Sequence, residues 1–458
     1  MTSVFWFRRD LRLQDNLALN AAVEAATDSV PGNVAAAYFF ELDYFDSLLP
    51  IRQHSLIASV EALDVEMNSQ LNIRVVSTAK GIAAELIAIC REQSATEVHA
   101  SRMFDPAGIA QQNLVGLELS AAGIYLRLTD SNYAVQPGTV RKPDGTPYKV
   151  YTPFYKAWLQ IGWGEPAVLP PLEWVRVGTR QSTPKPSGDA PIEIRAGYEF
   201  ALETFANFEQ RALHDYDEQR NRADLSGTSH LSHALAHGEI HPRTLLARLG
   251  DSDGEIVFAK ELCWREFYAD VLFHNPHSLD DYYEPRFAKM RYDDLPAAKA
   301  KFEAWQQGKT GYPMVDAGMR QLASAGWMHN RVRMIVASFL VKDLHIEWQH
   351  GARHFESLLT DFDPASNSHG WQWTAGCGTD ASPYYRVFNP VMQGYKFDPN
   401  GDYVRKYVPE LRHIEGAAVH EPWLLSSDAA PNYPGRIVDH AAERIEALER
   451  LEELKTLN

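Results

Sequence analysis

The periodicity of apolar residues changes once along this chain, and that change constrains the fold more than any other feature. Before residue 130, short apolar runs alternate with stretches whose apolar residues recur at helical spacing. The runs are SVFWFR (3–8), NVAAAYFF (33–40), NIRVV (72–76), TEVHAS (96–101) and IYLRLT (124–129). The helical stretches are 54–67, 82–91 and 106–122. Alternation of strands and helices predicts a parallel sheet covered on both faces.

Beyond residue 196 the pattern is helical. The predicted helices are 199–210, 254–275, 296–307, 312–325 and 330–343, with one amphipathic helix after 433. The segment between the two patterns is rich in Pro, Gly and Thr, which indicates a linker, and its LPPLEW (169–174) and STPKPSG (182–188) are expected to be exposed loop. We therefore predict an α/β domain with a Rossmann-like parallel sheet (1–130), a linker (131–195) and an all-α domain (196–458).

Composition narrows the class of protein. The chain has 458 residues, enough for two or three domains, and a net charge of −16. This charge counts against nucleic-acid binding, although a local basic patch is sufficient for such binding. Three cysteines without CxxC spacing, no long apolar run and no signal peptide predict a cytoplasmic protein that does not enter a membrane. No GxGxxG follows the first apolar run, so nothing indicates an NAD site.

The stretch DFDPASNSHGWQW combines features that rarely occur together. Asp361 and Asp363 frame a polar turn, and Asn367 lies in an expected loop of Ser, Asn and Gly. Trp371 and Trp373 follow, and large indoles this close are usually core or interface residues. The pattern fits either a lined ligand pocket or a core turn with a polar cap. Because no nucleophile, acid–base pair or metal cluster is evident, chemistry here would depend on a bound aromatic cofactor.

Three further constellations are candidates for binding. In a helix over 330–343, Asn330, Arg333, Met334 and Ala337 share one face while Arg331 points elsewhere, which fits a cavity rim or a surface stripe.

Tyr216 and Arg220 are one helical turn apart and precede SGTSHLS, whose hydroxyls and amides could hold phosphate or cap a helix. Glu261 and Trp264 are also one turn apart and could bind a flat polar ring, or belong to a buried helix. Four histidines fall nearby, but no carboxylate or Cys cluster completes a metal shell, so no metal is expected. They are His230, His233, His237 and His241.

These segments together resemble the photolyase/cryptochrome family. The resemblance covers nearly the whole chain and is most specific from 215 to 410, where NxxxWQW is similar to the class I enzymes that repair cyclobutane pyrimidine dimers. FRRDLRLQDN (7–16) is similar to the family's first strand and loop, whereas spacing alone predicts a solvated, salt-bridged loop there. The family's YTPFYKAW and GKTGYPMVDAGMRQL segments are also present.

The resemblance implies that the helical domain binds FAD. Arg333 would pair with Asp361, and Asn367 would face the central-ring nitrogen of the flavin. An amide there cannot deliver a proton, which favours a reduced flavin acting in repair over a photosensor. The implied cofactor-binding residues are Tyr216, Thr228, Ser229, His230, Leu231, Ser232, Arg265, Arg333, Asp361, Phe362, Asp363 and Asn367.

The resemblance also implies a DNA substrate whose dimer is flipped out beside the flavin. Glu261 would hydrogen-bond a pyrimidine edge, and blue light would drive one electron from reduced FAD to the dimer, which then splits. No metal is needed, and the chain is expected to act as a monomer. The residues implied to contact the lesion or its backbone are Arg220, Glu261, Trp264, Asn330, Arg331, Met334 and Trp373.

Trp371 and Trp348 match the inner members of the electron-transfer chain that reduces the flavin in this family. Leu295 stands where many relatives have the outer Trp, so Tyr292 or Trp305 could replace it, or photoreduction could be weak.

For an antenna chromophore, Ala107 and Gly108 replace the Asn-Glu pair of folate-binding relatives. DPAG and Arg52 favour 8-hydroxy-5-deazaflavin, or no antenna.

Three alternatives to dimer repair remain at this stage. A blue-light photoreceptor without repair activity is disfavoured by WQW, Asn367 and the lack of a long tail. Repair of (6-4) photoproducts would require adjacent histidines where this chain has His329 and Asn330. A flavin-dependent redox enzyme would need a nicotinamide site, which is not visible.

Overall fold

The computed structural model describes residues 2–26, 31–380, 385–426 and 428–457, and the chain forms two compact units. The first unit comprises Met1–Tyr148, Thr152–Arg211 and Ser229–His274. The second comprises Lys149–Tyr151, Ala212–Thr228 and Asn275–Asn458. These units are defined by internal contacts and do not follow the domain boundaries predicted from sequence, which stay a prediction.

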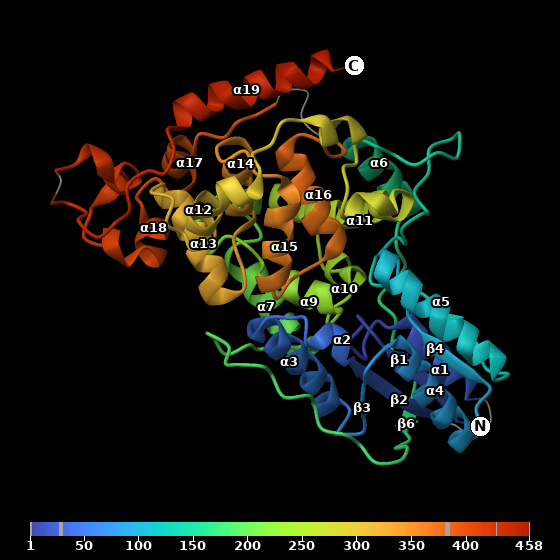
Figure 1. The fold of residues 1–458 in the computed structure, drawn as a ribbon. Helices are drawn as coiled ribbons and strands as arrows, with labels where there is room; N and C mark the ends of the chain where they lie inside the picture. The colour runs from blue at the N-terminus through green and yellow to red at the C-terminus, as the bar shows by residue number, and fades with distance from the viewer. Residues whose placement is uncertain (1, 27–30, 381–384, 427, 458) are drawn as a thin grey trace. The chain divides into compact units, whose positions relative to one another are not determined.

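A parallel sheet forms the core of the first unit (Figure 1). Its strand order is β3-β2-β1-β4-β5, the doubly wound order, with β6 paired to β2. The five predicted strands are confirmed, because apolar runs buried on both faces form the interior of such a sheet. The strands are β1 (Ser3–Phe7), β2 (Gly32–Glu41), β3 (Asn72–Val76), β4 (Glu97–Ala100), β5 (Tyr125–Leu128) and β6 (Leu172–Trp174).

Helices cover both faces of this sheet. Val4 and Trp6 of β1 pack in the cluster that contains α4 and α5, while Phe5 and Phe7 pack in the cluster that contains α1 and α3. This alternation follows from the two-residue period of a strand. The helices of the first unit are α1 (Leu17–Ala25), α2 (Leu42–Phe45), α3 (Pro50–Glu66), α4 (Ala79–Gln93), α5 (Pro106–Ala121), α6 (Tyr151–Ile161), α7 (Tyr198–Arg211), α9 (Ser232–His237), α10 (Pro242–Leu246) and α11 (Asp253–His274).

The prediction that LPPLEW is exposed loop was wrong in its second half. Leu172–Trp174 forms β6, which pairs in parallel with Gly32–Val34 of β2. β2 is long enough for this because β3 pairs only with its other half, Ala37–Glu41. A three-residue strand preceded by two prolines carries too little alternation to be recognised from sequence.

The prediction of a solvated loop at 7–16 was also wrong. Asp15 is buried, and its Oδ1 accepts hydrogen bonds from Nε and Nη2 of Arg243 at 2.9 and 2.8 Å. Its Oδ2 accepts one from Thr244 Oγ1 at 2.9 Å. Burial opposes ionisation of Asp15, but contacts with His241 and Arg243 hold the pKa of its carboxyl well below the usual range. The charges are therefore paired inside the unit and not in solvent.

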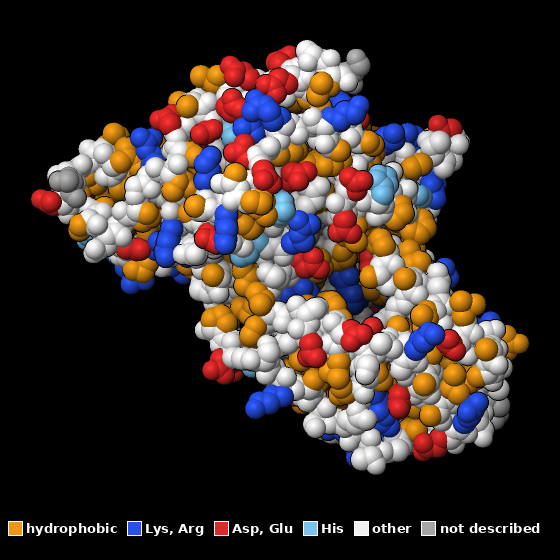
Figure 2. All heavy atoms as spheres, viewed as in Figure 1, with side chains coloured by type: hydrophobic (Ala, Val, Ile, Leu, Met, Phe, Trp, Pro, Cys, Tyr) orange, Lys and Arg blue, Asp and Glu red, His pale blue; other side chains and the backbone are white. Residues whose placement is uncertain are grey.

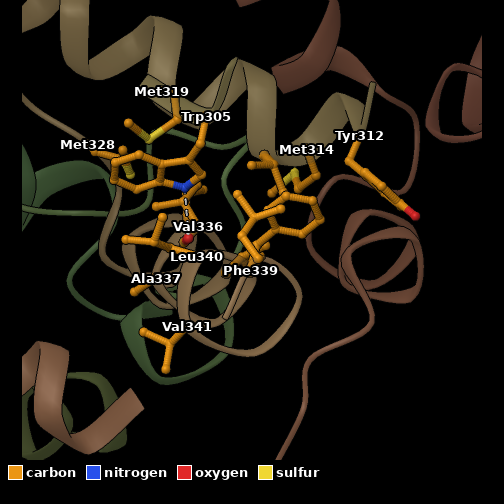
Figure 3. Packing of buried hydrophobic residues seen from close by; sticks show 14 of the residues in the cluster. Trp305, Tyr312, Met314, Met319, Met328, Val336, Ala337, Phe339, Leu340 and Val341 are labelled. Carbon is orange, nitrogen blue, oxygen red and sulfur yellow. Dashed lines mark hydrogen bonds between the residues drawn. The ribbon is translucent and has the colours of Figure 1, made fainter. Parts of the chain in front are cut away.

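The second unit is helical, as predicted beyond residue 275. A large apolar cluster fills it. Figure 3 shows part of this cluster, in which Trp305 Nε1 donates to the carbonyl of Val336 at 3.0 Å. The helices are α8 (Tyr216–Gln219), α12 (Leu295–Gln306), α13 (Pro313–Ala325), α14 (Asn330–Lys342), α15 (Trp348–Leu358), α16 (Pro364–Ala375), α17 (Pro390–Phe397), α18 (Asp402–Tyr407) and α19 (His440–Thr456). Short 3-10 helices are η1 (Pro276–Leu279), η2 (Pro285–Lys289), η3 (Pro409–Leu411), η4 (Gly416–His420) and η5 (Pro422–Leu424).

Surface charges are interspersed around α19. Figure 2 shows acidic and basic side chains side by side there, and Arg291 bridges Glu446 and Glu453 at 2.7 and 2.8 Å. In the described part of the chain, every helix is too short or too polar to cross a membrane.

Asp15→Asn tests whether the buried charge pairing stabilises the first unit. Asp15 has φ +50°, which Asn tolerates well, so the substitution removes mainly the charge. We expect a loss of about 3 kcal/mol at pH 7, because the buried Arg243 loses one of its two carboxylate partners and keeps only Asp130, at 3.0 Å. The pKa of Asp15 is lower in the folded state than in the unfolded state, where it is about 4. Its ionisation therefore stabilises the fold fully above about pH 4, and this contribution is lost as the pH falls through the folded-state pKa. The difference in unfolding free energy between variant and parent, measured by urea denaturation, should therefore become smaller below about pH 4.

The matched control is Glu203→Gln, which breaks an exposed ion pair with Arg195 at 3.1 Å. It should cost less than about 1 kcal/mol. Equal losses for the two variants would contradict the role assigned to Asp15.

Candidate functional site

One face of α11 carries the predicted lesion-binding residues of the first unit. Glu261, Trp264, Arg265 and Tyr268 recur at helical spacing and are all partly exposed, while the residues between them are buried. Arg265 is fixed by hydrogen bonds from Nη1 to the carbonyl of Asn132 at 2.7 Å and from Nη2 to that of Leu235 at 3.2 Å. A carboxylate and an indole are thus presented together on a rigid helix.

The opposite face of α11 is anchored by Glu266, which is fully buried. Its carboxylate accepts hydrogen bonds from the amides of Ala134 and Val135 at 2.5 and 3.0 Å. It also accepts one from Trp158 Nε1 at 2.6 Å. Three donors on one carboxylate hold the helix against the predicted linker, and this fixes the direction of Glu261 and Trp264.

The loop before α9 contains the predicted phosphate-binding residues. His230 is exposed with φ +54°, and Leu231 is buried at the N-cap of α9 with its amide 3.4 Å from Ser229 Oγ. No side chain caps α9, so the ordinary Ser/Thr cap considered from sequence is not formed there. Thr228, which ends a segment of the second unit, and Ser232 are both partly buried.

The nearby histidines have protein partners. His233 Nε2 lies 3.3 Å from Glu239 Oε1, and His241 Nε2 lies 3.0 Å from the carbonyl of Ser131. Within the described ranges, no group of three His, Cys, Asp or Glu side chains could hold a metal ion.

In the second unit, Arg333 and Asp361 form the ion pair that the resemblance implied. Arg333 Nη2 lies 2.7 Å from Asp361 Oδ2, and Arg333 Nε donates to the carbonyl of Met328 at 2.8 Å. Asp361 Oδ1 is buried, and no described protein atom donates a hydrogen bond to it. A buried carboxylate oxygen without a donor is costly, so this oxygen fits a donor supplied by a bound polar group.

The expected loop around Asn367 is a helix, which corrects the prediction made from sequence. α16 begins at Pro364, and Asp363 caps it by accepting from the amide of Ser366 at 2.8 Å. Asp before Pro is a recognisable start signal that outweighs the poor helix propensity of the following Ser, Asn and Gly. Asn367 is therefore in the first turn, partly exposed, with Nδ2 donating to the carbonyl of Ala352 at 3.1 Å. Phe362 packs against the core of this unit.

The two indoles of α16 lie in different surroundings. Trp371 is buried, and its ring contacts those of Phe355 and Trp305 with centroids 5.0 and 6.1 Å apart. Trp373 is partly exposed, and its Nε1 donates to the carbonyl of Asp380 at 3.1 Å. Trp371 is thus part of the core, while Trp373 is available to a ligand.

Sequence reasoning missed Gln372, the residue between these tryptophans. Its buried amide donates to the carbonyl of Ser278 at 2.8 Å and accepts from the amide of Tyr283 at 2.7 Å. The signal was present, since a Gln enclosed by two indoles must satisfy its amide within the protein. Gln372 therefore ties the segment after α11 to α16.

The predicted face of α14 is graded from exposed to buried. Asn330 is exposed, Arg333 and Met334 are partly exposed, and Ala337 is buried. Arg331 points elsewhere, as predicted, and its Nη2 donates to Asn221 Oδ1 at 2.7 Å.

Tyr216 and Arg220 also lie close together, because Tyr216 begins α8 and Arg220 caps its end. The Arg220 guanidinium lies 5.9 Å from the ring centroid of Tyr216.

Known proteins share this combination of a doubly wound sheet and a helical unit. Residues 3–173 match the family described as DNA photolyase, and residues 258–453 match the FAD binding domain of DNA photolyase. The deoxyribodipyrimidine photo-lyase of Vibrio cholerae is 38% identical over 96% of this chain and 97% of its own length. That of Escherichia coli is 36% identical over 98% of both chains.

Solved structures agree. A bacterial class III photolyase from Agrobacterium tumefaciens is 36% identical, with a TM-score of 0.88 over 100% of this chain and 98% of its own. A cryptochrome from Synechocystis is 26% identical, with a TM-score of 0.85 over 98% of both chains. The chain belongs to the photolyase/cryptochrome family. Its class within that family stays a prediction.

Gly351→Ala tests the packing that sets α16 in place. A Cβ on Gly351 would stand 2.1 Å from Trp371 Cη2, so the indole or the helix must shift. We expect a loss of about 1–3 kcal/mol in unfolding free energy, measured by urea denaturation. Gly370→Ala is the matched control, because a Cβ there meets nothing within 4 Å. It should be neutral or stabilising by up to about 1 kcal/mol, and a similar loss in both variants would contradict this packing argument.

Proposed function

We propose that this chain is a light-driven carbon–carbon lyase that repairs cyclobutane pyrimidine dimers in DNA with FAD as cofactor. The observation that carries this proposal is the match, along nearly the whole chain, to relatives named deoxyribodipyrimidine photo-lyase. FAD, when bound and reduced, supplies the light-excited electron that splits the dimer. The protein needs no acid–base pair for such a reaction and instead provides position, a dry cavity and electrostatics.

Residues of the second unit are proposed to hold the flavin and ribose parts of FAD. The Arg333–Asp361 pair supports this, because Arg333 holds Oδ2 of Asp361 while no described protein atom donates to its buried Oδ1, which can accept from a donor on the cofactor. Asp363 is already the cap of α16, so its part is to fix the start of that helix close to the ligand. Asn367, in the first turn, would present an amide to the central ring. Phe362 would pack beside the cofactor.

Contacts with the phosphates of FAD are proposed for each unit separately. In the second unit they are Tyr216, which is buried, and Thr228. In the first unit they are residues of the Ser229–Ser232 loop, whose hydroxyls and amides are of the kind that binds anions. Arg265, fixed by its two carbonyl partners, adds positive charge to that unit.

Contacts with the flipped dimer are proposed for each unit separately. In the first unit they are Glu261 and Trp264 of α11, and in the second unit Met334 and Trp373, which are partly exposed. Flipping costs a few kcal/mol, and less for a lesion that already stacks poorly. Stacking on an indole offsets part of that cost by about 1–3 kcal/mol per base. The Glu261 carboxylate would orient the dimer by accepting a hydrogen bond from the N–H edge of a pyrimidine. In a correctly paired base, this edge is covered by the pairing partner.

The DNA backbone is proposed to contact Arg220, Arg331 and Asn330. All three are at least partly exposed, and Arg331 is held by Asn221 in a fixed position. Local arginines of this kind are sufficient for phosphate binding in a chain whose net charge is −16.

A photoreceptor without repair activity is the alternative function. The likeness to a cryptochrome of known structure supports a shared fold, but the curated relatives of higher identity are photo-lyases. Asn367 also argues against it, since an amide cannot protonate the flavin.

For the antenna, we propose 8-hydroxy-5-deazaflavin at the carboxyl ends of the strands in the first unit. Arg52 follows the end of β2, and its Nη2 donates to Tyr44 Oη at 3.0 Å. At the start of α5, the amide of Gly108 donates to Asp105 Oδ1 at 2.9 Å. Ligands of doubly wound sheets bind at this edge. The mass of chromophores extracted from protein of the native host would identify the antenna.

Glu261→Gln tests the contact with the lesion. A neutral amide cannot replace a charge-assisted hydrogen bond worth about 1.5–3 kcal/mol, so affinity for a dimer-containing oligonucleotide should fall by about tenfold or more. Light-dependent repair should fall with it while FAD stays bound. The assay is repair of the oligonucleotide under blue light, with a dark sample. Asp253→Asn, which neutralises an exposed carboxylate on the same helix, is the control, and equal repair by both variants would exclude this role.

Arg333→Ala tests the FAD contact. Asp361 would be left buried without its partner, which costs about 3–5 kcal/mol, so FAD content per chain should fall strongly. The ratio of flavin to protein absorbance measures this. Arg353→Ala removes an exposed arginine from α15 and should retain FAD. If the Arg333 variant retains FAD in full, the proposed role of Asp361 in binding FAD is refuted.

A further inference from the structure

A buried tyrosine, Tyr282, lies beside Trp348 in the second unit. Only 3% of Tyr282 is exposed, and its ring centroid is 6.2 Å from that of Trp348, with the two planes nearly perpendicular at 86°. Its hydroxyl donates a hydrogen bond to Glu347 Oε1 at 2.9 Å. Three groups are therefore adjacent here: the indole of Trp348, the phenol of Tyr282, which can be oxidised, and the carboxylate of Glu347, which can act as a base.

The two aromatic side chains differ in where their protons can go. Trp348 Nε1 is buried, and no described protein atom accepts a hydrogen bond from it. An oxidised Trp348 therefore keeps its proton and remains a radical cation, which is a strong oxidant. Tyr282, by contrast, has a carboxylate on its hydroxyl.

We propose that Tyr282 and Glu347 form a proton-coupled electron donor to Trp348. This inference rests on the proposed function, because the oxidant is the indole radical cation that remains when Trp348 gives an electron toward a photo-excited flavin. In the step, one electron passes from Tyr282 to Trp348, and the phenolic O–H bond breaks as its proton forms a new O–H bond with Glu347 Oε1. The products are neutral Trp348, a neutral phenoxyl radical on Tyr282 and a protonated Glu347.

The surroundings favour coupled movement of the proton and the electron. Burial raises the pKa of Tyr282, so the hydroxyl is protonated before the step. Loss of an electron alone would leave a positive charge on a buried ring, which is costly. Glu347 Oε1 already accepts the hydrogen bond of the phenol at 2.9 Å, so the proton has only to move along an existing hydrogen bond.

The other candidates for the outer position lack these features. Leu295 has no group that can be oxidised. Trp305 contacts Trp371 but is fully buried, and its N–H donates to a backbone carbonyl, which is a poor base.

Tyr292, in contrast, stacks on Tyr282 with centroids 6.4 Å apart and is partly exposed. It connects Tyr282 to the surface of the unit, where hydrogen-atom donation from a thiol can restore the phenol.

The test uses the purified full chain with its flavin oxidised. A light flash is followed by electron paramagnetic resonance and transient absorption, which distinguish tyrosyl from tryptophanyl radicals. We expect a tyrosyl radical in the parent, its loss in Tyr282→Phe with a longer-lived Trp radical cation, and slower formation in Glu347→Gln. Tyr403→Phe is the matched control, because Tyr403 is another buried tyrosine with a bonded hydroxyl, and it should keep the signal.

A tyrosyl signal that persists in Tyr282→Phe, or one that disappears in Trp305→Phe, would overturn the proposal. If Tyr282→Phe does not fold, the proposal is tested with the parent protein in D₂O. Decay of the Trp radical cation must be slower there, because a deuteron replaces the transferred proton. If the protein carries no flavin, azide radicals generated by pulse radiolysis oxidise tryptophan instead, and the same transfer to tyrosine is expected.

Failure of this inference is distinguishable from failure of the proposed function. Chemically reduced parent protein that does not repair a dimer-containing oligonucleotide under blue light refutes the function. Parent protein that repairs but forms no tyrosyl radical refutes the relay alone.

Discussion

The close approach of α15 to α16 determines the geometry of the second unit. Gly351 lets the Trp371 ring lie directly on the backbone of α15, where any larger residue would collide with it. With the helices fixed at this distance, Asn367 reaches the carbonyl of Ala352 and Gln372 reaches the segment that contains Ser278. The residues proposed to contact the flavin and those proposed to supply its electrons are thus positioned by the same contact.

Buried polar groups divide into two kinds, and the division indicates which of them act on a ligand. Glu266 is buried and accepts hydrogen bonds from three donors, which hold α11 in place. Asp361 is equally buried, but one of its oxygens has no donor among the described residues. A native fold retains such a group only where something compensates for it. The first carboxylate is structural, whereas the second is the one that we propose to bind a ligand.

The sequence predicted the elements well where local pattern decides structure, and poorly where distant partners decide it. The five main strands follow from apolar runs, and the main helices from their spacing. The burial of Asp15 could not be predicted, because its partner Arg243 is 228 residues away. The helix that carries Asn367 could have been predicted, since the Asp-Pro start signal at Asp363 was visible and only the low propensity of the following residues obscured it.

The site residues were predicted mainly through family resemblance, and they stay a prediction. That route gives no answer where the resemblance breaks down. Leu295 shows only that the usual outer electron donor is missing. Nothing in the sequence links Tyr282 to Glu347, which lies 65 residues further along, until the fold brings them to 2.9 Å. Tyr282 differs from Trp348 in having a proton acceptor on its polar group. An oxidised aromatic ring is stabilised as a neutral radical where its proton can be transferred to such an acceptor. Under the proposed relay, the location of a long-lived radical is therefore decided by hydrogen-bond partners as much as by the identity of the rings.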